Sequence, residues 1–257
     1  MTLNVKDLDP KDRFNAAVKR SHEAHRDFLV RGNRCPNCVL VKPFCVCEKL
    51  EALKCRIPEY RIAVLMNQRE QYRSSNTAKV IERIVNGEIF IDGLDEGWNK
   101  FQALLEEYSG RVFVLFPSET SVEYSPEVVV GADGVEKLIV VVDGTWRQAR
   151  RLNLKIPKAI PRVRIQPSTL SKFLCRRQTR VDRVCTAEAL ALLLLDMEME
   201  DPSTRLDTGL SELVECFNLQ CYRSTLRPQR MLKHPPQLMA GGTTLPPRHP
   251  DSLIDPS

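Results

Sequence analysis

The sequence predicts an α/β fold in which a mostly parallel sheet is flanked by helices. Two apolar runs, residues 112–116 and 138–142, consist almost wholly of Val, Leu, Ile and Phe. Such runs are typical of strands that are buried on both faces of a parallel sheet. Segments with the helical spacing of apolar residues alternate with the strand-like runs. In open sheets of this kind, ligands bind beyond the carboxyl ends of the strands.

The remaining elements follow from the same patterns. Residues 11–30 mix charged and apolar side chains and predict a helix that packs loosely on the rest. Further strands are expected at 61–66 and 88–91. Further helices are expected at 77–85, 98–108, 186–195 and 206–221, with a basic helix that begins at Trp146. The helix at 186–195 is apolar all round and should be buried.

The composition of the chain and the positions of its Cys, Pro and Gly residues suggest four regions. We expect an N-terminal helical segment at 1–30, a zinc knuckle at 31–56, a large α/β domain at 57–232 and a disordered, Pro-rich tail at 233–257. Abundant Pro and Gly and few apolar residues make a packed core unfavourable in the tail.

The overall composition favours a soluble protein that is not secreted. The 257 residues are 42% hydrophobic and 28% charged, and the net charge of +5 suits an RNA enzyme as well as many other proteins. The first ten residues are polar and unlike a signal peptide, and the longest apolar run, 189–195, is too short to span a bilayer. We therefore expect a cytoplasmic or nuclear protein, where nine cysteines serve metals or cores more often than disulfides.

Four cysteines lie within thirteen residues, in the pattern Cys35-x-x-Cys38 and Cys45-x-Cys47. Four thiolates at this spacing can close a tetrahedral shell around a structural zinc ion. An iron–sulfur cluster also accepts four cysteines, and reduced thiols that bind no metal are a third possibility. A closed zinc shell has no open position for a substrate, so the zinc that we expect would support the fold or an RNA contact.

A polar segment, residues 70–77, separates an expected strand from an expected helix. Ser75, Asn76 and Thr77 are all frequent N-cap residues, and the N–H groups at a helix start attract anions. A phosphate or a carboxylate could bind there, with Arg73 beside it. An ordinary helix cap in a solvent-exposed loop is the alternative.

Two motifs follow the buried strands. Phe116-Pro117-Ser118 is by itself no more than a strand end with a proline. Asp143-Gly144-Thr145-Trp146 is more informative. An acid at the end of a buried strand can face a ligand crevice, and Trp offers a stacking surface worth about 1–3 kcal/mol in nucleic-acid complexes. The alternative is a capping Asp or Thr with the Trp packed in the core.

Arginines cluster near two of these motifs. Arg147, Arg150 and Arg151 follow the Trp and suit phosphates. The segment 174–185 contains four more arginines, which could clamp an RNA backbone. It leads into the helix that Thr186 opens, where Glu188 is favourable in the first turn. A charged loop that is merely solvated is the alternative.

The order of these motifs, more than any one of them, resembles the DTW-domain family from about residue 34 to 225. The family takes its name from Asp143, Thr145 and Trp146. The Asp-x-Thr-Trp and Cys-Thr-Ala-Glu elements are specific, whereas Phe-Pro-Ser is weak. Related sequences often carry a proline just before the Ser-Asn-Thr turn, and residues 68–71 lack one. This departure leaves a role for Glu70 open.

The resemblance implies a fold related to the SPOUT methyltransferases, with a knotted cofactor site, and makes residues 57–232 the DTW (SPOUT-like) catalytic domain. It also implies a tRNA-uridine aminocarboxypropyltransferase, with S-adenosylmethionine as group donor, tRNA as partner and 5′-methylthioadenosine as by-product. The donor would contact Phe116, Pro117, Ser118, Asp143, Gly144, Thr145, Trp146, Thr186, Ala187 and Glu188. RNA would contact Arg73, Ser75, Asn76, Thr77, Arg147, Arg150, Arg151, Arg176, Arg177 and Arg180.

The implied chemistry assigns Asp143 as the base. N3 of uridine must lose a proton and attack the γ-carbon of the methionine moiety, and positioning decides that the methyl carbon does not react instead. Two other functions remain possible from the sequence. A SPOUT-like RNA methyltransferase would use the same donor and a different carbon, and a non-catalytic zinc-knuckle RNA-binding protein would use Asp143 only as a cap.

Overall fold

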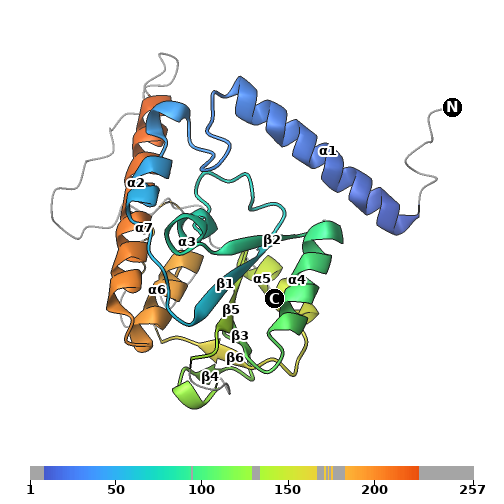
Figure 1. Cartoon of the computed structure of the whole chain (residues 1–257). Helices are drawn as coiled ribbons and strands as arrows, with labels where there is room; N and C mark the ends of the chain where they lie inside the picture. Colours follow the sequence, from blue (N-terminus) through green and yellow to red (C-terminus); the bar gives the residue numbers. More distant parts are fainter. Residues whose placement is uncertain are drawn as a thin grey trace, which may run out of the picture. The chain divides into compact units, whose positions relative to one another are not determined.

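The computed structural model confirms the parallel α/β fold (Figure 1). It describes residues 9–93, 95–128, 134–166, 171, 173, 175 and 183–225. In this part of the chain six strands form one sheet in the order β2-β1-β5-β3-β6-β4, and each neighbouring pair is parallel. The strands are β1 (Tyr60–Asn67), β2 (Glu88–Asp92), β3 (Val112–Leu115), β4 (Val122–Glu123), β5 (Lys137–Asp143) and β6 (Arg162–Arg164).

The helices agree with the expected segments, with one addition. They are α1 (Pro10–Arg31), α2 (Cys47–Ala52), α3 (Ala78–Val85), α4 (Asp95–Glu107), α5 (Trp146–Lys155), α6 (Thr186–Asp196) and α7 (Glu200–Thr225). Two 3₁₀ turns, η2 (Lys42–Phe44) and η3 (Pro126–Val128), complete the described elements. Helix α2 and the short strands β4 and β6 were not predicted from the sequence.

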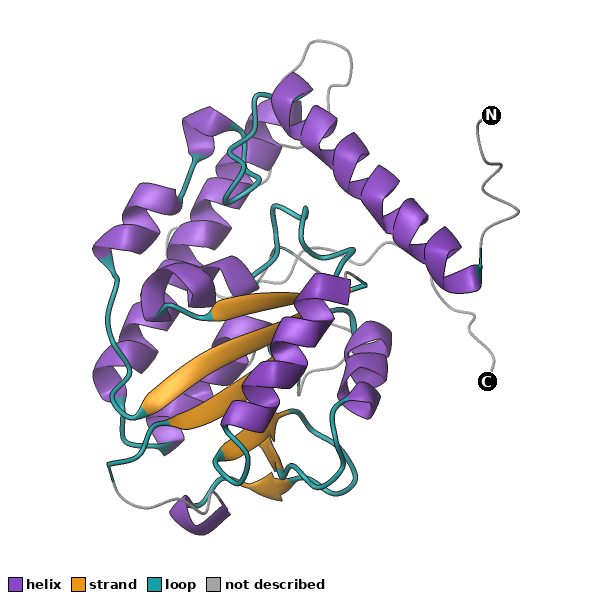
Figure 2. Cartoon of the chain, turned by 45° about the vertical axis from the view of Figure 1, so that its right-hand side comes forward, coloured by secondary structure: helices purple, strands orange, loops and turns teal. Residues whose placement is uncertain are grey.

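Helices cover both faces of the sheet (Figure 2). Alternate residues of β1 divide between two cores: Ile62 and Val64 face one, and Ala63 and Leu65 face the other. The first core also contains apolar residues of α3, α6 and α7, and the second contains those of α4 and α5. Because the central strands are buried on both sides, their sequences are continuously apolar.

A glycine allows α7 to approach its neighbours closely. A Cβ atom at Gly209 would lie 2.3 Å from Cδ1 of Ile84 on α3 and 3.0 Å from Cδ2 of Leu50 on α2. Both neighbouring side chains are fully buried, so they have little space into which to move. The contact joins three helices of the first core.

A buried arginine secures the far end of α5. The last carbonyls of a helix lack partners within the helix. The guanidinium of Arg162 donates to the carbonyl oxygens of Asn153, Ile156 and Pro157 at 3.2, 2.9 and 2.7 Å. The helix that begins at Trp146 is thereby attached to the start of β6.

The chain divides into two units, residues 1–221 and residues 222–257, and the whole sheet belongs to the first unit. The boundaries predicted near residues 30, 56 and 232 stay predictions, and the expected tail at 233–257 lies outside the described residues. Among the described helices, none combines the length and the apolar character that a membrane span requires.

Candidate active site and metal centre

A cavity of about 870 Å³ lies at the carboxyl edge of the sheet. Its lining comes from the ends of four neighbouring strands and the segments that follow them: 75–77 after β1, 141–147 at the end of β5, 115–117 at the end of β3 and 165–166 after β6. Residues at the start of α6 complete it. This is the edge at which open parallel sheets bind ligands, and the cavity is within the size range of small-molecule sites.

Asp143 is the last residue of β5, and its side chain connects three segments of this edge. The residue is only 4% exposed. Asn76 Nδ2 donates to Asp143 Oδ2 at 2.6 Å, and Thr186 Oγ1 donates to Asp143 Oδ1 at 2.5 Å. A buried carboxylate requires such donors, since desolvation is costly without them. The carboxylate is therefore held in a defined orientation between the starts of α3 and α6.

The Ser-Asn-Thr turn is arranged around the same carboxylate. The Oδ1 atom of Asn76 accepts a hydrogen bond from the backbone N–H of Ala78, the first residue of α3, at 3.0 Å, while its Nδ2 atom donates to Asp143. The Thr77 hydroxyl accepts a longer bond from the backbone of Ala187. Asn76 and Thr77 are both buried. Thr77 is the N-cap residue of α3 and makes no side-chain capping bond, and the first N–H of the helix is satisfied by Asn76 instead. Both residues line the cavity and do not belong to a solvent-exposed loop.

Thr145 and Trp146 have different roles. Thr145 caps α5: its hydroxyl accepts from the backbone N–H of Gln148, and the Gln148 side chain accepts from the backbone N–H of Thr145. Trp146 is half-buried and lines the cavity. Its ring lies 6.3 Å from that of Phe116, and the guanidinium of Arg183 lies 4.5 Å above it. The capping alternative thus holds for Thr145, whereas Trp146 offers aromatic surface to the cavity.

Basic side chains lie at the cavity and beside it. Arg147 and Arg150 line the cavity and are exposed, and Arg151 is exposed on α5 but does not line it. The Arg73 side chain is 46% exposed and lies 3.5 Å from the buried carboxylate of Glu70. Arg176, Arg177 and Arg180 lie outside the described residues.

Three residues expected at the donor site lie beside the cavity and do not line it. The backbone N–H of Ser118 donates to Ser121, and Ala187 is buried. The carboxylate of Glu188 accepts from the backbone of Cys185 at 2.8 Å and from the hydroxyl of Ser171 at 2.6 Å. Glu188 therefore orders the start of α6, on which Thr186 reaches Asp143.

Other lining residues could not be recognised from the sequence. Ile165 and Gln166 follow β6, a strand of only three residues with Arg at both ends, which is too short to be distinguished from a loop in the sequence. Phe173 lies in a segment without periodicity. Arg183 was counted only among the arginines of the basic segment, and its position over Trp146 has no signal in the sequence.

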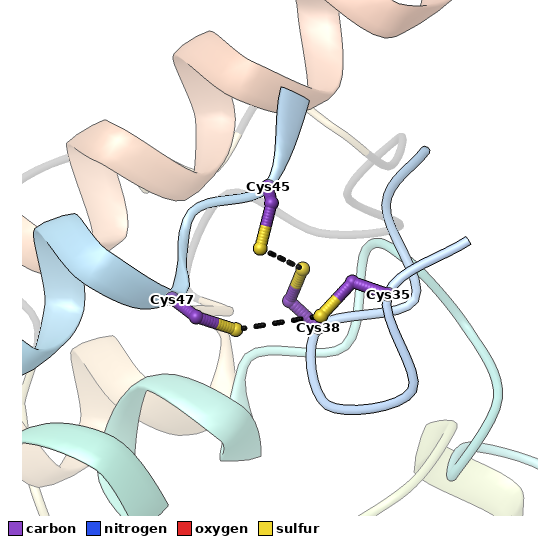
Figure 3. Close-up of side chains that lie close together, drawn as sticks. All are labelled: Cys35, Cys38, Cys45 and Cys47. Atoms are coloured by element: carbon purple, nitrogen blue, oxygen red, sulfur yellow. Dashed lines mark hydrogen bonds between the residues drawn. The ribbon is translucent and has the colours of Figure 1, made fainter. Parts of the chain in front are cut away.

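The four cysteines of the knuckle converge, as their spacing predicts (Figure 3). Their sulfur atoms all lie within 4.8 Å of one another. The Cys35–Cys47 and Cys38–Cys45 sulfur pairs are each 3.7 Å apart. Cys35 and Cys38 are buried, and the other two are half-buried.

These distances fit one metal ion. Zinc–sulfur bonds of about 2.3 Å in a tetrahedron place the sulfurs about 3.8 Å apart. An iron–sulfur cluster distributes four thiolates over two or four irons, so cysteine sulfurs bound to different irons lie farther apart than these four do. The four residues can therefore hold zinc, and they leave no ligand position open for a substrate.

The thiols also influence each other's ionisation. Hydrogen bonding by Cys47 lowers the pKa of Cys38 to about 4. Burial raises the pKa of Cys45 to about 11, and hydrogen bonding to Cys38 raises the pKa of Cys47 far above its usual value. The thiols of Cys38, Cys45 and Cys47 thus titrate as coupled groups, with the pKa of Cys38 lowered and those of Cys45 and Cys47 raised. A metal that requires four thiolates must displace the remaining protons, so its affinity should rise with pH.

The fold and the cavity define a parallel α/β protein with a buried acid at the carboxyl edge of its sheet and a four-cysteine cluster that can hold a metal ion. The model of the DTW domain matches residues 32–223, or 192 of the 257 residues. The chain belongs to the DTW-domain family, as the order of its motifs indicates. Membership supports a function in tRNA modification. No solved structure matches the chain.

Proposed function

We propose that this protein transfers the 3-amino-3-carboxypropyl group of S-adenosylmethionine to N3 of a tRNA uridine and releases 5′-methylthioadenosine. One observation carries the proposal: the motifs of the family meet in a single cavity, around the buried carboxylate of Asp143. Membership of the family supports a function in tRNA modification, and the cavity offers a place for the donor and the base in this proposal.

The cavity suits the donor in size and in chemistry. A volume of about 870 Å³ accommodates a molecule of nucleoside size with room for an incoming base. Phe116 and Trp146 provide aromatic surface for adenine. Arg183 provides a cation for the carboxylate of the methionine moiety, and Asp143 provides an anion near the positively charged sulfonium.

Asp143 acts as the base in this proposal. It takes the proton from N3 of uridine while N3 forms a bond to the γ-carbon of the donor. The bond between that carbon and sulfur breaks, and its electron pair neutralises the sulfonium as 5′-methylthioadenosine leaves. Asn76 and Thr186 hold the carboxylate so that no reorientation is needed during proton transfer. The choice of the γ-carbon over the methyl carbon depends on how the cavity orients the donor.

The tRNA backbone approaches along the exposed start of α5. Arg147 and Arg150 belong both to the cavity lining and to the surface. Arginines in this position can contact phosphates on either side of an inserted nucleotide. Arg73, Arg151 and the basic residues of segment 174–185 extend the same contact in this proposal.

The knuckle holds one structural zinc ion, and the catalytic domain has a SPOUT-like, knotted path, in line with the family resemblance. The sulfur geometry supports the zinc assignment. A protein with these substrates acts in the cytoplasm or the nucleus. In this proposal the zinc ion stabilises the fold, and the reaction takes place in the cavity.

The test uses donor that is labelled either in the methyl group or in the carboxyl group. Purified protein is incubated with each donor and unmodified tRNA. The tRNA is then digested to nucleosides, whose masses and labels are measured by chromatography and mass spectrometry. The carboxyl label should appear on a uridine, and the methyl label should not. Transfer of the methyl label would show an RNA methyltransferase instead. Transfer of neither label, with intact donor and tRNA binding, would show a non-catalytic RNA-binding protein.

A further inference from the structure

A buried lysine lies between the metal knuckle and the candidate active site. Lys79 is on α3, and only 5% of its surface is exposed. Its Nζ atom donates to the carbonyl oxygen of Cys38 at 2.6 Å, to that of Arg73 at 2.9 Å and to that of Ser74 at 3.3 Å. An ammonium group has three N–H donors, so these acceptors match its donors.

One of the three acceptors belongs to the knuckle. Cys38 contributes its sulfur to the four-cysteine cluster and its carbonyl oxygen to Lys79. The carbonyl oxygen of Cys38 is separated from its sulfur by few bonds, and the turn that carries both is closed by the hydrogen bond from Val39 N to Cys35 O. A metal ion that fixes the sulfur therefore also fixes the carbonyl group that Lys79 contacts.

The other two acceptors belong to the loop that positions Asn76. The carbonyl oxygen of Arg73 accepts from Lys79 and also from the backbone N–H of Asn76 at 3.0 Å. Asn76 in turn donates to Asp143. A continuous series of hydrogen bonds thus runs from the knuckle through Lys79 and the loop to the carboxylate.

We propose that Lys79 is a positioning residue that couples the metal-bound knuckle to the Asn76–Asp143 pair. A buried ammonium without acceptors is strongly unfavourable, so the loop and the knuckle are each held in the position that satisfies it. If the knuckle loses its metal, the Cys38 carbonyl moves, Lys79 loses one acceptor, and the loop with Asn76 loosens. The metal thereby supports catalysis from outside the cavity. The effect on turnover rests on the function proposed above, whereas the structural coupling does not.

The experiment compares wild type with Lys79→Met, Lys79→Arg and the control Lys54→Met. Lys54 is an exposed lysine whose ion pair with Glu51 lies outside the cavity and the cluster. Metal content, hydrogen exchange of residues 68–77, and kcat and KM are measured for each protein. Lys79→Met removes the three donors and keeps the length of the side chain, and Lys79→Arg restores a cation.

Lys79→Met should retain one metal ion per chain and lose exchange protection in residues 68–77. Its kcat should fall by about 2- to 30-fold, the usual range for residues that relay coupling, with little change in KM for the donor. Lys79→Arg should recover part of the loss, and Lys54→Met should match wild type. Chelation of the metal should deprotect residues 68–77 in wild type and add little in Lys79→Met, since the two changes break the same connection.

The coupling is refuted if Lys79→Met shows wild-type exchange in residues 68–77, or if its effect and that of chelation are independent. If Lys79→Met does not fold, hydrogen exchange of residues 68–77 is compared in Lys79→Arg and in chelated wild type. Protected amides in α6 then show that the fold is intact. Unchanged exchange in residues 68–77 of chelated, folded wild type would also refute the coupling. Altered exchange without any aminocarboxypropyl transfer would uphold the coupling and refute the proposed reaction.

Discussion

Replacing Asp143 by Asn tests the assignment of the catalytic base most directly. The side chain keeps its size, so the packing at the end of β5 is preserved. Asn76 can continue to donate to the remaining oxygen, and the Thr186 hydroxyl can rotate to accept from the new amide instead of donating. Both hydrogen bonds therefore survive in the variant, while the ability to take a proton is lost.

The structure sets the expected magnitudes. With both hydrogen bonds retained, the free energy of unfolding should change by no more than about 1 kcal/mol. A positioned base contributes about 10²–10⁴-fold to the rate, so kcat should fall by that factor, equivalent to about 3–5 kcal/mol of barrier. Thr186→Val is the matched comparison, because it removes one hydrogen bond to Asp143 and leaves the carboxylate in place. It should retain more activity than Asp143→Asn.

The assay measures single-turnover rates on unmodified tRNA between neutral and alkaline pH. Donor and tRNA affinities are measured separately and should stay close to those of wild type. Alkaline pH should partly rescue Asp143→Asn, because uridine N3 then ionises without a base. Full activity of the variant would show that Asp143 is only a structural acceptor. Loss of folding or of donor binding would assign it to the scaffold, and the base would have to be another group.

Three further predictions follow from the same structure. Elemental analysis should find one zinc per chain, and Cys38→Ser should lower thermal stability as the shell opens; iron with a visible chromophore would contradict the zinc assignment. Charge reversal by Arg147→Glu and Arg150→Glu together should weaken tRNA binding and flatten its dependence on salt, with donor affinity nearly unchanged; normal tRNA binding at all salt concentrations would contradict a role in RNA contact. Gly209→Ala should destabilise the protein by about 1–3 kcal/mol in urea unfolding, since overpacking exceeds the helix preference of Ala of about 1 kcal/mol; a stabilised variant would refute the close approach of α7.

Long elements with strong periodicity could be predicted, and short ones could not. Strand β5 is buried on both faces, and its sequence is apolar throughout. Strands β4 and β6 contain two and three residues, and β6 places an arginine in the interior, where five hydrogen bonds satisfy it. Arginine is usually exposed, so its presence argues against a buried strand when only the sequence is known. Helix α2 could not be predicted because it begins at Cys47, which belongs to the metal-binding motif.

The place of Asp143 and of the Ser-Asn-Thr turn at the edge of the sheet could be predicted from the sequence, but their hydrogen-bond partners could not. A parallel sheet brings the carboxyl ends of its strands to one edge, so Asp143 and the Ser-Asn-Thr turn could be expected near each other. The contact between Thr186 and Asp143 depends on the path of the chain between β6 and α6, which carries no regular pattern. Glu188 was expected beside the donor, whereas its hydrogen bonds to Cys185 and Ser171 show how it orders the helix start.

Lys79 shows why a pattern of residue types is insufficient for such contacts. Lys79 stands between Ala78 and Val80 near the start of α3. From the sequence alone, a lysine at such a position is expected to point into solvent. Here it is buried, because carbonyl oxygens from the knuckle and from the loop after β1 converge on its side chain. Those carbonyls belong to the backbone and leave no signature in the sequence. The series of hydrogen bonds from Cys38 through Lys79 and the loop to Asp143 is therefore a property of the fold, and it connects the knuckle to the cavity that contains Asp143.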